Sequence, residues 1–174
     1  DFLDQVIDSG IKVLKIEGRG RAADYVATVI KTYREAIDSY YEGTFTKEKI
    51  QTWMEALATV YNRGFWSGYY LGQKLGEWSD NPGSNATQKK VYVGKGMHYF
   101  PKSSIAEFKI EAYDIKKGDK ILITGPSTGA QELILEDFFV NDVTSEKATK
   151  GDSCTLKVPF RIRLSDKMYK IVEN

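Results

Sequence analysis

Val13-Leu-Lys-Ile-Glu-Gly-Arg19 is the stretch of this chain that says most about its fold. It continues an apolar run that begins at Ile11, and it passes directly from aliphatic residues into a charged turn. A short run that is apolar on both faces is typical of a buried parallel strand. Apolar residues at helical spacing lie on both sides of it, so the order helix, strand, helix predicts one unit of a repeated β–α fold.

Helical spacing is clear on both sides of this strand. Residues 2–7 predict a short first helix, and a longer one runs from Arg21 to about Tyr41, where Gly43 ends it. Thr46 is a suitable N-cap for a third helix, because its hydroxyl can accept backbone N–H bonds. The two longer helices have the apolar stripes Ala22, Val26, Val29, Tyr33, Ala36, Ile37 and Tyr40, and Ile50, Trp53, Met54, Leu57 and Tyr61.

The pattern changes after a polar linker at Gly76–Gln88, which is rich in Ser, Asn, Pro and Gly. Beyond it, apolar and polar residues alternate with the two-residue period of strands. The predicted strands are Lys90–Met97, Ile105–Ala112, Lys120–Thr124, Gln131–Phe139, Cys154–Val158 and Met168–Val172. Many short strands separated by turns favour a small antiparallel barrel or sandwich.

Charge and composition exclude several classes of protein. The net charge is +1, so no global field draws the chain to nucleic acid or membrane. Residues 1–88 carry 10 basic and 12 acidic side chains, whereas residues 89–174 carry 15 and 12, a mild positive bias compatible with weak anion contact. No apolar run approaches the roughly 20 residues that span a bilayer. One cysteine, Cys154, favours a reducing cytoplasmic setting, and the missing initiator Met indicates a fragment of a longer protein.

Three groups of short motifs stand out along the chain. Leu14-Lys-Ile-Glu-Gly-Arg19 is followed by Ala23-Asp-Tyr-Val-Ala27 and Tyr33-Arg34, and then by Asn62-Arg-Gly-Phe65 and Gly68-Tyr-Tyr70. The strand-rich half contains Val93-Gly-Lys95, Gly118-Asp-Lys-Ile121, Gly125-Pro126, Gly129, Lys150-Gly-Asp152 and Lys167-Met-Tyr-Lys170. Together these motifs resemble the C-terminal region of the collagenase-like peptidase family, peptidase family U32. Some members of that family are tRNA uridine hydroxylation proteins that use prephenate.

The resemblance implies an α+β fold in two parts. Residues 1–78 are expected to form the last βα unit of a TIM-like barrel with trailing helices, residues 79–88 a linker, and residues 89–174 a small antiparallel β-barrel similar to domain 2 of elongation factor Tu. The partner of the first part is then the missing N-terminal barrel of the parent protein. The cysteine-rich signature of the family has no match here, so we expect no complete active site in this chain.

Glu17 and Arg19 are the candidate catalytic residues. They follow the carboxyl end of the predicted strand, which is the catalytic face of a βα-barrel. A carboxylate and a guanidinium there can position a polar or anionic substrate. The alternative is a structural ion pair at the barrel rim. Gly18-Arg-Gly-Arg21 can likewise cradle an anion at a helix N-terminus, although a plain tight turn explains it better.

Basic and aromatic residues of the second half are the candidate nucleic-acid contacts. Basic side chains can contact phosphates and aromatic rings can stack on bases. The candidates are Lys95, His98, Tyr99, Lys102, Arg161 and Arg163, with Lys89 and Lys90 beside them. The alternative, a solvated outer surface of the barrel, is favoured by the sequence alone.

Metal and cofactor chemistry have no support in the sequence. His98 is the single histidine and Cys154 the single cysteine, so the chain does not supply a zinc site, and we expect no cofactor. Three hypotheses remain: a tRNA-modifying enzyme whose barrel contacts RNA, a peptidase whose barrel presents protein substrate, and a structural barrel that stabilises or dimerises the parent protein. Possible partners are therefore tRNA, a protein substrate or a second copy of the chain, and no membrane.

Overall fold

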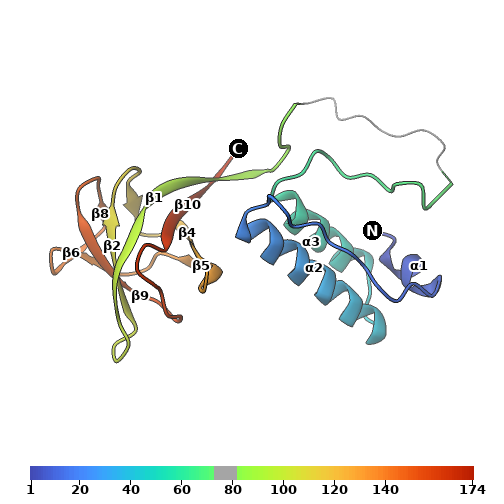
Figure 1. Cartoon of the computed structure of the whole chain (residues 1–174), viewed down its shortest axis with the longest axis horizontal. Helices are drawn as coiled ribbons and strands as arrows, with labels where there is room; N and C mark the ends of the chain where they lie inside the picture. The colour runs from blue at the N-terminus through green and yellow to red at the C-terminus, as the bar shows by residue number, and fades with distance from the viewer. Residues whose placement is uncertain (73–81) are drawn as a thin grey trace. The chain divides into compact units, whose positions relative to one another are not determined.

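The computed structural model describes residues 1–72 and 82–174. They form two compact units, one made of Asp1–Thr87 with Asn174 and the other of Gln88–Glu173. The first unit contains the described helices and the second the described strands (Figure 1). None of the described helices has both the length and the apolar character that a membrane crossing requires.

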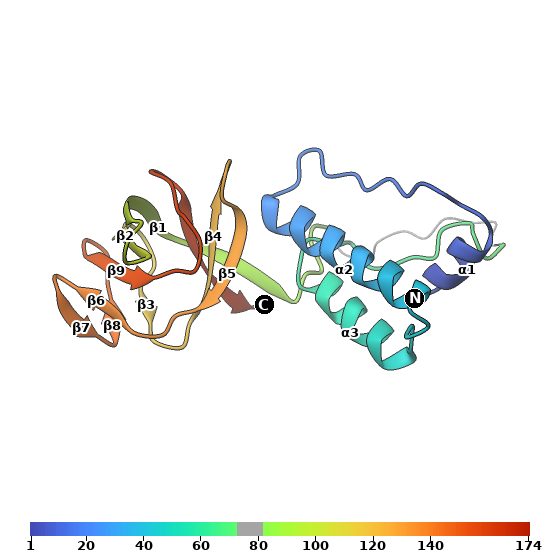
Figure 2. The same ribbon diagram turned by 90° about the horizontal axis from the view of Figure 1, so that it is seen from below.

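The helical unit contains α1 (Leu3–Asp8), α2 (Ala23–Tyr41) and α3 (Lys47–Ala58). Helices α2 and α3 lie side by side in both views (Figures 1 and 2). The predicted cap at Thr46 is confirmed, because its side chain accepts the backbone N–H of Lys49 at 3.4 Å. Gly43 follows the C-cap of α2 with φ of 69°, a left-handed conformation that glycine adopts without steric cost.

The predicted strand at Ile11–Ile16 is absent from the structure, where this segment is extended coil. Ile11, Val13 and Leu14 are exposed, and Val13 retains 81% of its accessible surface. The reason is that a strand needs neighbours for its N–H and C=O groups. The described part of the helical unit contains no other strand that can supply them. The apolar side chains of this segment therefore have no neighbouring strand to pair with and to bury them among the described residues.

The second unit is built on a large antiparallel sheet. Among the described residues, eight strands pair in the order β5-β4-β10-β1-β2-β9-β6-β7, and β3 pairs with β8 separately. The strands are β1 (Gln88–Phe100), β2 (Ile105–Ile110), β3 (Ile115–Lys116), β4 (Lys120–Gly125), β5 (Gly129–Ile134), β6 (Phe138–Val140), β7 (Val143–Ser145), β8 (Lys147–Ala148), β9 (Ser153–Lys157) and β10 (Lys167–Glu173). The long strand β1 pairs with β10 on one side and β2 on the other.

One side of this sheet carries the apolar core. It includes Val93, Phe108, Ile110, Ile121, Ile123, Phe138, Cys154, Leu156 and Met168, each at most 3% exposed. The α+β class is thus correct at the level of a large antiparallel sheet with a few helices.

The predicted strand Gln131–Phe139 is divided in the structure into β5 and β6. The break lies at Leu135, whose N–H bonds the carbonyl of Asp119 and whose carbonyl accepts the N–H of Gly118. These two bonds turn the chain, and Leu135 becomes part of the core. Strands β3, β7 and β8 were not predicted, because two or three residues are too few to show a two-residue period.

The predicted linker Gly76–Gln88 lies outside the described residues up to position 81. After position 81, the backbone forms hydrogen bonds with residues at the end of α3 and just after it. The N–H of Asn85 donates to the carbonyl of Asn62 at 2.7 Å, and the N–H of Thr87 donates to the carbonyl of Ala58 at 2.9 Å.

Candidate functional site

A row of lysines crosses the centre of the sheet. Lys95 in β1 is directly opposite Lys167 in β10 and Lys109 in β2. Directly opposed residues of an antiparallel pair project their side chains to the same face. The residues next in sequence to this row, Gly94, Ile110 and Met168 among them, are buried, so the lysines occupy the outer face. Thr124 and Ser153 extend the row on either side.

The lysine row is only partly neutralised. Lys95 Nζ lies 2.8 Å from Glu111 Oε1, and the other oxygen of Glu111 accepts the Tyr92 hydroxyl at 2.5 Å. Lys109 Nζ donates to the carbonyl of Gly151. For Lys167 the described part of the chain shows no ion pair. Like charges directly opposite destabilise a sheet, so this row favours a negatively charged group outside it.

The pKa values of Glu111 and Tyr92 shift in opposite directions. Hydrogen bonds from Lys95 and then from Tyr92 lower the pKa of the Glu111 carboxyl. Burial, together with the bond to Glu111, raises the pKa of Tyr92 to about 12. Glu111 is therefore ionised and Tyr92 protonated at neutral pH. Lys95 thus has a counter-ion at neutral pH, and the row of three lysines retains net positive charge.

Two glycines explain how Lys95 is held in this position. A Cβ atom on Gly94 would lie 1.8 Å from the carbonyl oxygen of Lys109, and one on Gly96 would lie 2.9 Å from that of Arg163. Only glycine allows these backbones to approach so closely. The N–H of Gly96 also bonds the carbonyl of Asp166 at 2.7 Å, and its own carbonyl accepts the N–H of Ser165. The Gly-Lys-Gly motif thus joins β1 to β2 and to the loop before β10.

The structure places the predicted nucleic-acid residues at different parts of this surface. Arg161 and Arg163 are exposed in the loop between β9 and β10, and the backbone of Arg163 lies against Gly96. His98 is exposed in β1, with its ring 4.4 Å from that of Phe100. Tyr99 is half-buried and packs against the core. Lys102 is exposed in the turn between β1 and β2. The backbone of Arg163 lies beside Gly96, the residue after Lys95. Lys102 lies at the turn of the β1–β2 hairpin, away from Lys95.

Lys109 and Lys167 were missed by sequence reasoning. They are far apart in the chain and meet Lys95 only through strand register. Alternation shows that each lysine faces outward, but it does not show which residues stand opposite one another. The register also shifts at the bulges between Tyr92 and Gly94 and between Gly96 and His98, which alternation does not reveal.

Glu17 and Arg19 lie in the exposed coil before α2. The Glu17 carboxylate accepts the backbone N–H of Arg19 at 2.7 Å and so closes a local turn. The N–H of Arg21 bonds the carbonyl of Gly18 one step later. These bonds show a structural role for the turn.

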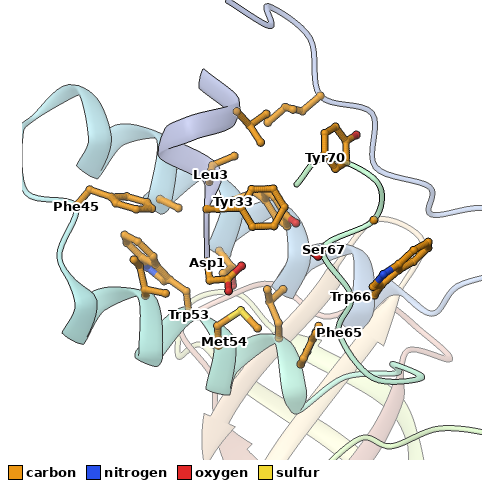
Figure 3. Close-up of a pocket in the computed structure, with 18 residues that line it drawn as sticks. Asp1, Leu3, Tyr33, Phe45, Trp53, Met54, Phe65, Trp66, Ser67 and Tyr70 are labelled. Atoms are coloured by element: carbon orange, nitrogen blue, oxygen red, sulfur yellow. The ribbon is translucent and has the colours of Figure 1, made fainter. Parts of the chain in front are cut away.

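A cavity of about 540 Å³ lies within the helical unit. Figure 3 shows Tyr33 from α2, with Trp53 and Met54 from α3, around it. Phe65, Ser67 and Tyr70 belong to the segment after α3 that lines the same space. The lining is largely aromatic and aliphatic, so the cavity suits an apolar group, and its described lining residues include no nucleophile–base set.

Ser39, Thr44 and Lys49 form the one serine–lysine contact of interest in the described residues. Lys49 Nζ lies 3.1 Å from Ser39 Oγ and 2.7 Å from Thr44 Oγ1, and the two hydroxyl oxygens are 2.8 Å apart. Serine–lysine pairs occur as nucleophile and base. Here Ser39 is 3% exposed, and the exposed ammonium donates to it. A cation is also favoured near the C-terminus of a helix, so this cluster fastens α2 to α3.

The described residues contain neither a cluster of metal ligands nor a reactive thiol. Across residues 1–72 and 82–174 no three His, Cys, Asp or Glu side chains gather as metal ligands. Cys154 is buried in β9, and burial raises the pKa of its thiol to about 12. A thiol with that pKa is a poor nucleophile at neutral pH.

Comparison with known proteins identifies the family. Residues 1–80 match the family model of peptidase family U32. The chain belongs to peptidase family U32. A collagenase of Porphyromonas gingivalis is 50% identical to this U32 chain over 169 residues, which are 97% of the chain and 41% of the collagenase. The chain therefore spans about two fifths of the length of that curated relative.

Two further comparisons are with a second curated relative and with a solved structure. A tRNA hydroxylation protein of Bacillus subtilis is 30% identical over 128 residues, covering 72% of this chain and 30% of that protein. A solved structure, the C-terminal domain of a Geobacillus thermoleovorans protein described as a U32 peptidase, has a TM-score of 0.43 and 19% identity. It covers 45% of this chain and 96% of that domain.

Proposed function

We propose that this chain is an accessory, RNA-contacting portion of a tRNA-modifying U32 protein. The observation that carries the proposal is the lysine row Lys167–Lys95–Lys109 on the outer face of the sheet. Three cations in register, with one carboxylate among them, suit the repeated phosphates of a nucleic-acid backbone. Such contacts position RNA without reading its sequence.

The relatives and the surrounding residues support this assignment. The Bacillus subtilis relative is named for tRNA hydroxylation, and its match covers most of this chain. Arg161, Arg163 and Lys102 add positive charge at the margins, and the exposed rings of His98 and Phe100 suit base stacking. In this proposal the sheet belongs to a small β-barrel similar to domain 2 of elongation factor Tu, and the protein acts in the reducing cytoplasm.

The helical unit has a separate part in the proposal. Ile11–Ile16 becomes a strand when it pairs with the rest of a TIM-like barrel, which would cover the exposed side chains of Val13 and Leu14. Glu17 and Arg19 would then follow the carboxyl end of that strand, on the catalytic face. The domain division expected from the sequence, residues 1–78, 79–88 and 89–174, is retained.

A tRNA titration at two salt concentrations tests the RNA contact. Lys109→Ala combined with Lys167→Ala should weaken tRNA binding and reduce the slope of log K against log salt by roughly one to two units. The matched control is Lys31→Ala with Arg34→Ala, which also removes two positive charges, from helix α2. Equal losses in both double variants would indicate a general charge effect, and no loss in either would remove the RNA assignment.

The second candidate function is peptide hydrolysis by the parent protein, with the sheet presenting protein substrate. The 50% identity to a collagenase favours it. The two candidates differ in the ligand of the sheet. Binding of denatured collagen that competes with tRNA and is lost in the Lys109/Lys167 double variant would favour the peptidase. Binding of neither ligand would leave a structural or dimerising role for the sheet.

A further inference from the structure

Two arginines from separate segments meet on one tyrosine in the helical unit. Arg21 precedes α2, and its guanidinium carbon lies 4.1 Å from the centre of the Tyr61 ring and 5.6 Å from that of Tyr25. Arg63 follows α3, and its Nε donates to the Tyr61 hydroxyl at 3.0 Å. The segment before α2 and the segment after α3 thus place two cations on the same phenol.

Arg21 and Arg63 each carry more hydrogen-bond donors than a single phenol oxygen can accept. A guanidinium carries five N–H donors, and Arg63 uses its Nε group on Tyr61. The guanidinium carbon of Arg21 lies over the Tyr61 ring, and this group also carries five N–H donors, more than its contact with Tyr61 requires. Arg34 differs, because its Nε and Nη2 both bond the Asp38 carboxylate, at 3.0 and 2.5 Å.

The positive charges of Arg21 and Arg63 are not balanced by an ion pair among the described residues. Glu17, a carboxylate that precedes Arg21 in the sequence, accepts the backbone N–H of Arg19. Tyr61 does not supply the missing charge, although hydrogen bonds from Arg63 and then from Arg21 lower its pKa. Two guanidinium groups on one phenol repel each other, and an anion between them removes that repulsion.

We propose that Arg21, Tyr61 and Arg63 form a binding site for a small-molecule oxyanion, a phosphate or a carboxylate. The Tyr61 oxygen accepts from Arg63, which leaves its own O–H free to donate to the ligand. The planar fork of an arginine matches both kinds of oxyanion with two parallel hydrogen bonds. The site lies in the helical unit and does not depend on RNA binding by the sheet.

Arginine side-chain NMR signals test the site directly. The ¹⁵N-labelled chain is titrated with methyl phosphate, with acetate and with chloride at constant ionic strength. The Nε–H signals of Arg21 and Arg63 should move along one saturable curve with one of the two oxyanions, while that of Arg34 stays in place. If methyl phosphate binds more tightly than acetate, the ligand is a phosphate, and if acetate binds more tightly, it is a carboxylate. Either result supports the site.

Variants complete the test. Arg21→Ala and Arg63→Ala should each weaken oxyanion binding by about tenfold, since each removes charge-assisted hydrogen bonds. Arg34→Ala, the matched control, should leave the affinity unchanged. If Arg63→Ala fails to fold, Arg63→Lys keeps the charge and removes the fork, and should also bind less tightly. Shifts that do not saturate, that chloride reproduces, or that persist in both arginine variants would overturn the proposal.

Discussion

Gly94 faces the backbone of Lys109 so closely that a Cβ atom on it would lie 1.8 Å from the Lys109 carbonyl oxygen. Backbone atoms cannot yield as the end of a flexible side chain can. The approach lies next to the bulge at Tyr92 and Gly94, where β10 and β2 both pair with β1. The placement of Lys95 among the other lysines therefore depends on a glycine at this position.

Gly94→Ala should destabilise the strand unit strongly. The added methyl forces β1 and β2 apart, and overpacking of this kind typically costs about 1–3 kcal/mol or more of unfolding free energy. Gly18→Ala is the control, because a Cβ there meets the side chain of Val26 at 3.0 Å. Chemical denaturation measures both. A Gly94→Ala protein as stable as wild type would contradict the close approach.

The Lys95–Glu111 pair should make stability depend on pH. Because the pKa of Glu111 is lowered in the folded state, its contribution is complete above the ordinary carboxyl pKa and is lost as pH falls through the lowered value. Thermal melts of wild type and Glu111→Gln should differ most near neutral pH and converge in acid. Glu55→Gln, in α3, provides the control. A difference that stays constant down to pH 3 would show that charge is not the cause.

Lys49 should matter for the helical unit through its bonds to Ser39 and Thr44. Lys49→Met keeps the length of the side chain and removes the donors, and should lower the unfolding free energy by about 1 kcal/mol. Lys47→Met, in the exposed first turn of α3, should change it by less than about 0.5 kcal/mol. Urea titration followed by circular dichroism gives both values, and equal values would remove the role assigned to the cluster.

The Cys154 thiol should be unreactive in the folded protein. Its pKa of about 12 and its burial in β9 keep it protonated and inaccessible at neutral pH. A thiol reagent such as dithionitrobenzoate should react at the rate of unfolding, and completely in denaturant. Fast labelling of the native protein, at a rate proportional to the reagent concentration, would show that β9 opens locally.

Local structure was largely predictable from the sequence. Helix α2 ends before Gly43 and α3 begins after Thr46, because left-handed turns and N-caps depend on residues a few positions apart. The antiparallel strands were mostly found from alternation, because each outward polar residue stands next to an inward apolar one. Their ends moved by a few residues, and the division at Leu135 was missed because it depends on Asp119.

Only the tertiary structure decided which distant residues meet. Lys95, Lys109 and Lys167 share a row because of strand register, and Arg21 and Arg63 share Tyr61 because α2 and α3 bring their segments together. The apolar run at Ile11–Ile16 shows the opposite case. Its composition is that of a buried strand, but burial requires neighbouring strands that the described residues do not provide. Composition and periodicity determine which face of an element is apolar, and the rest of the fold determines what covers it.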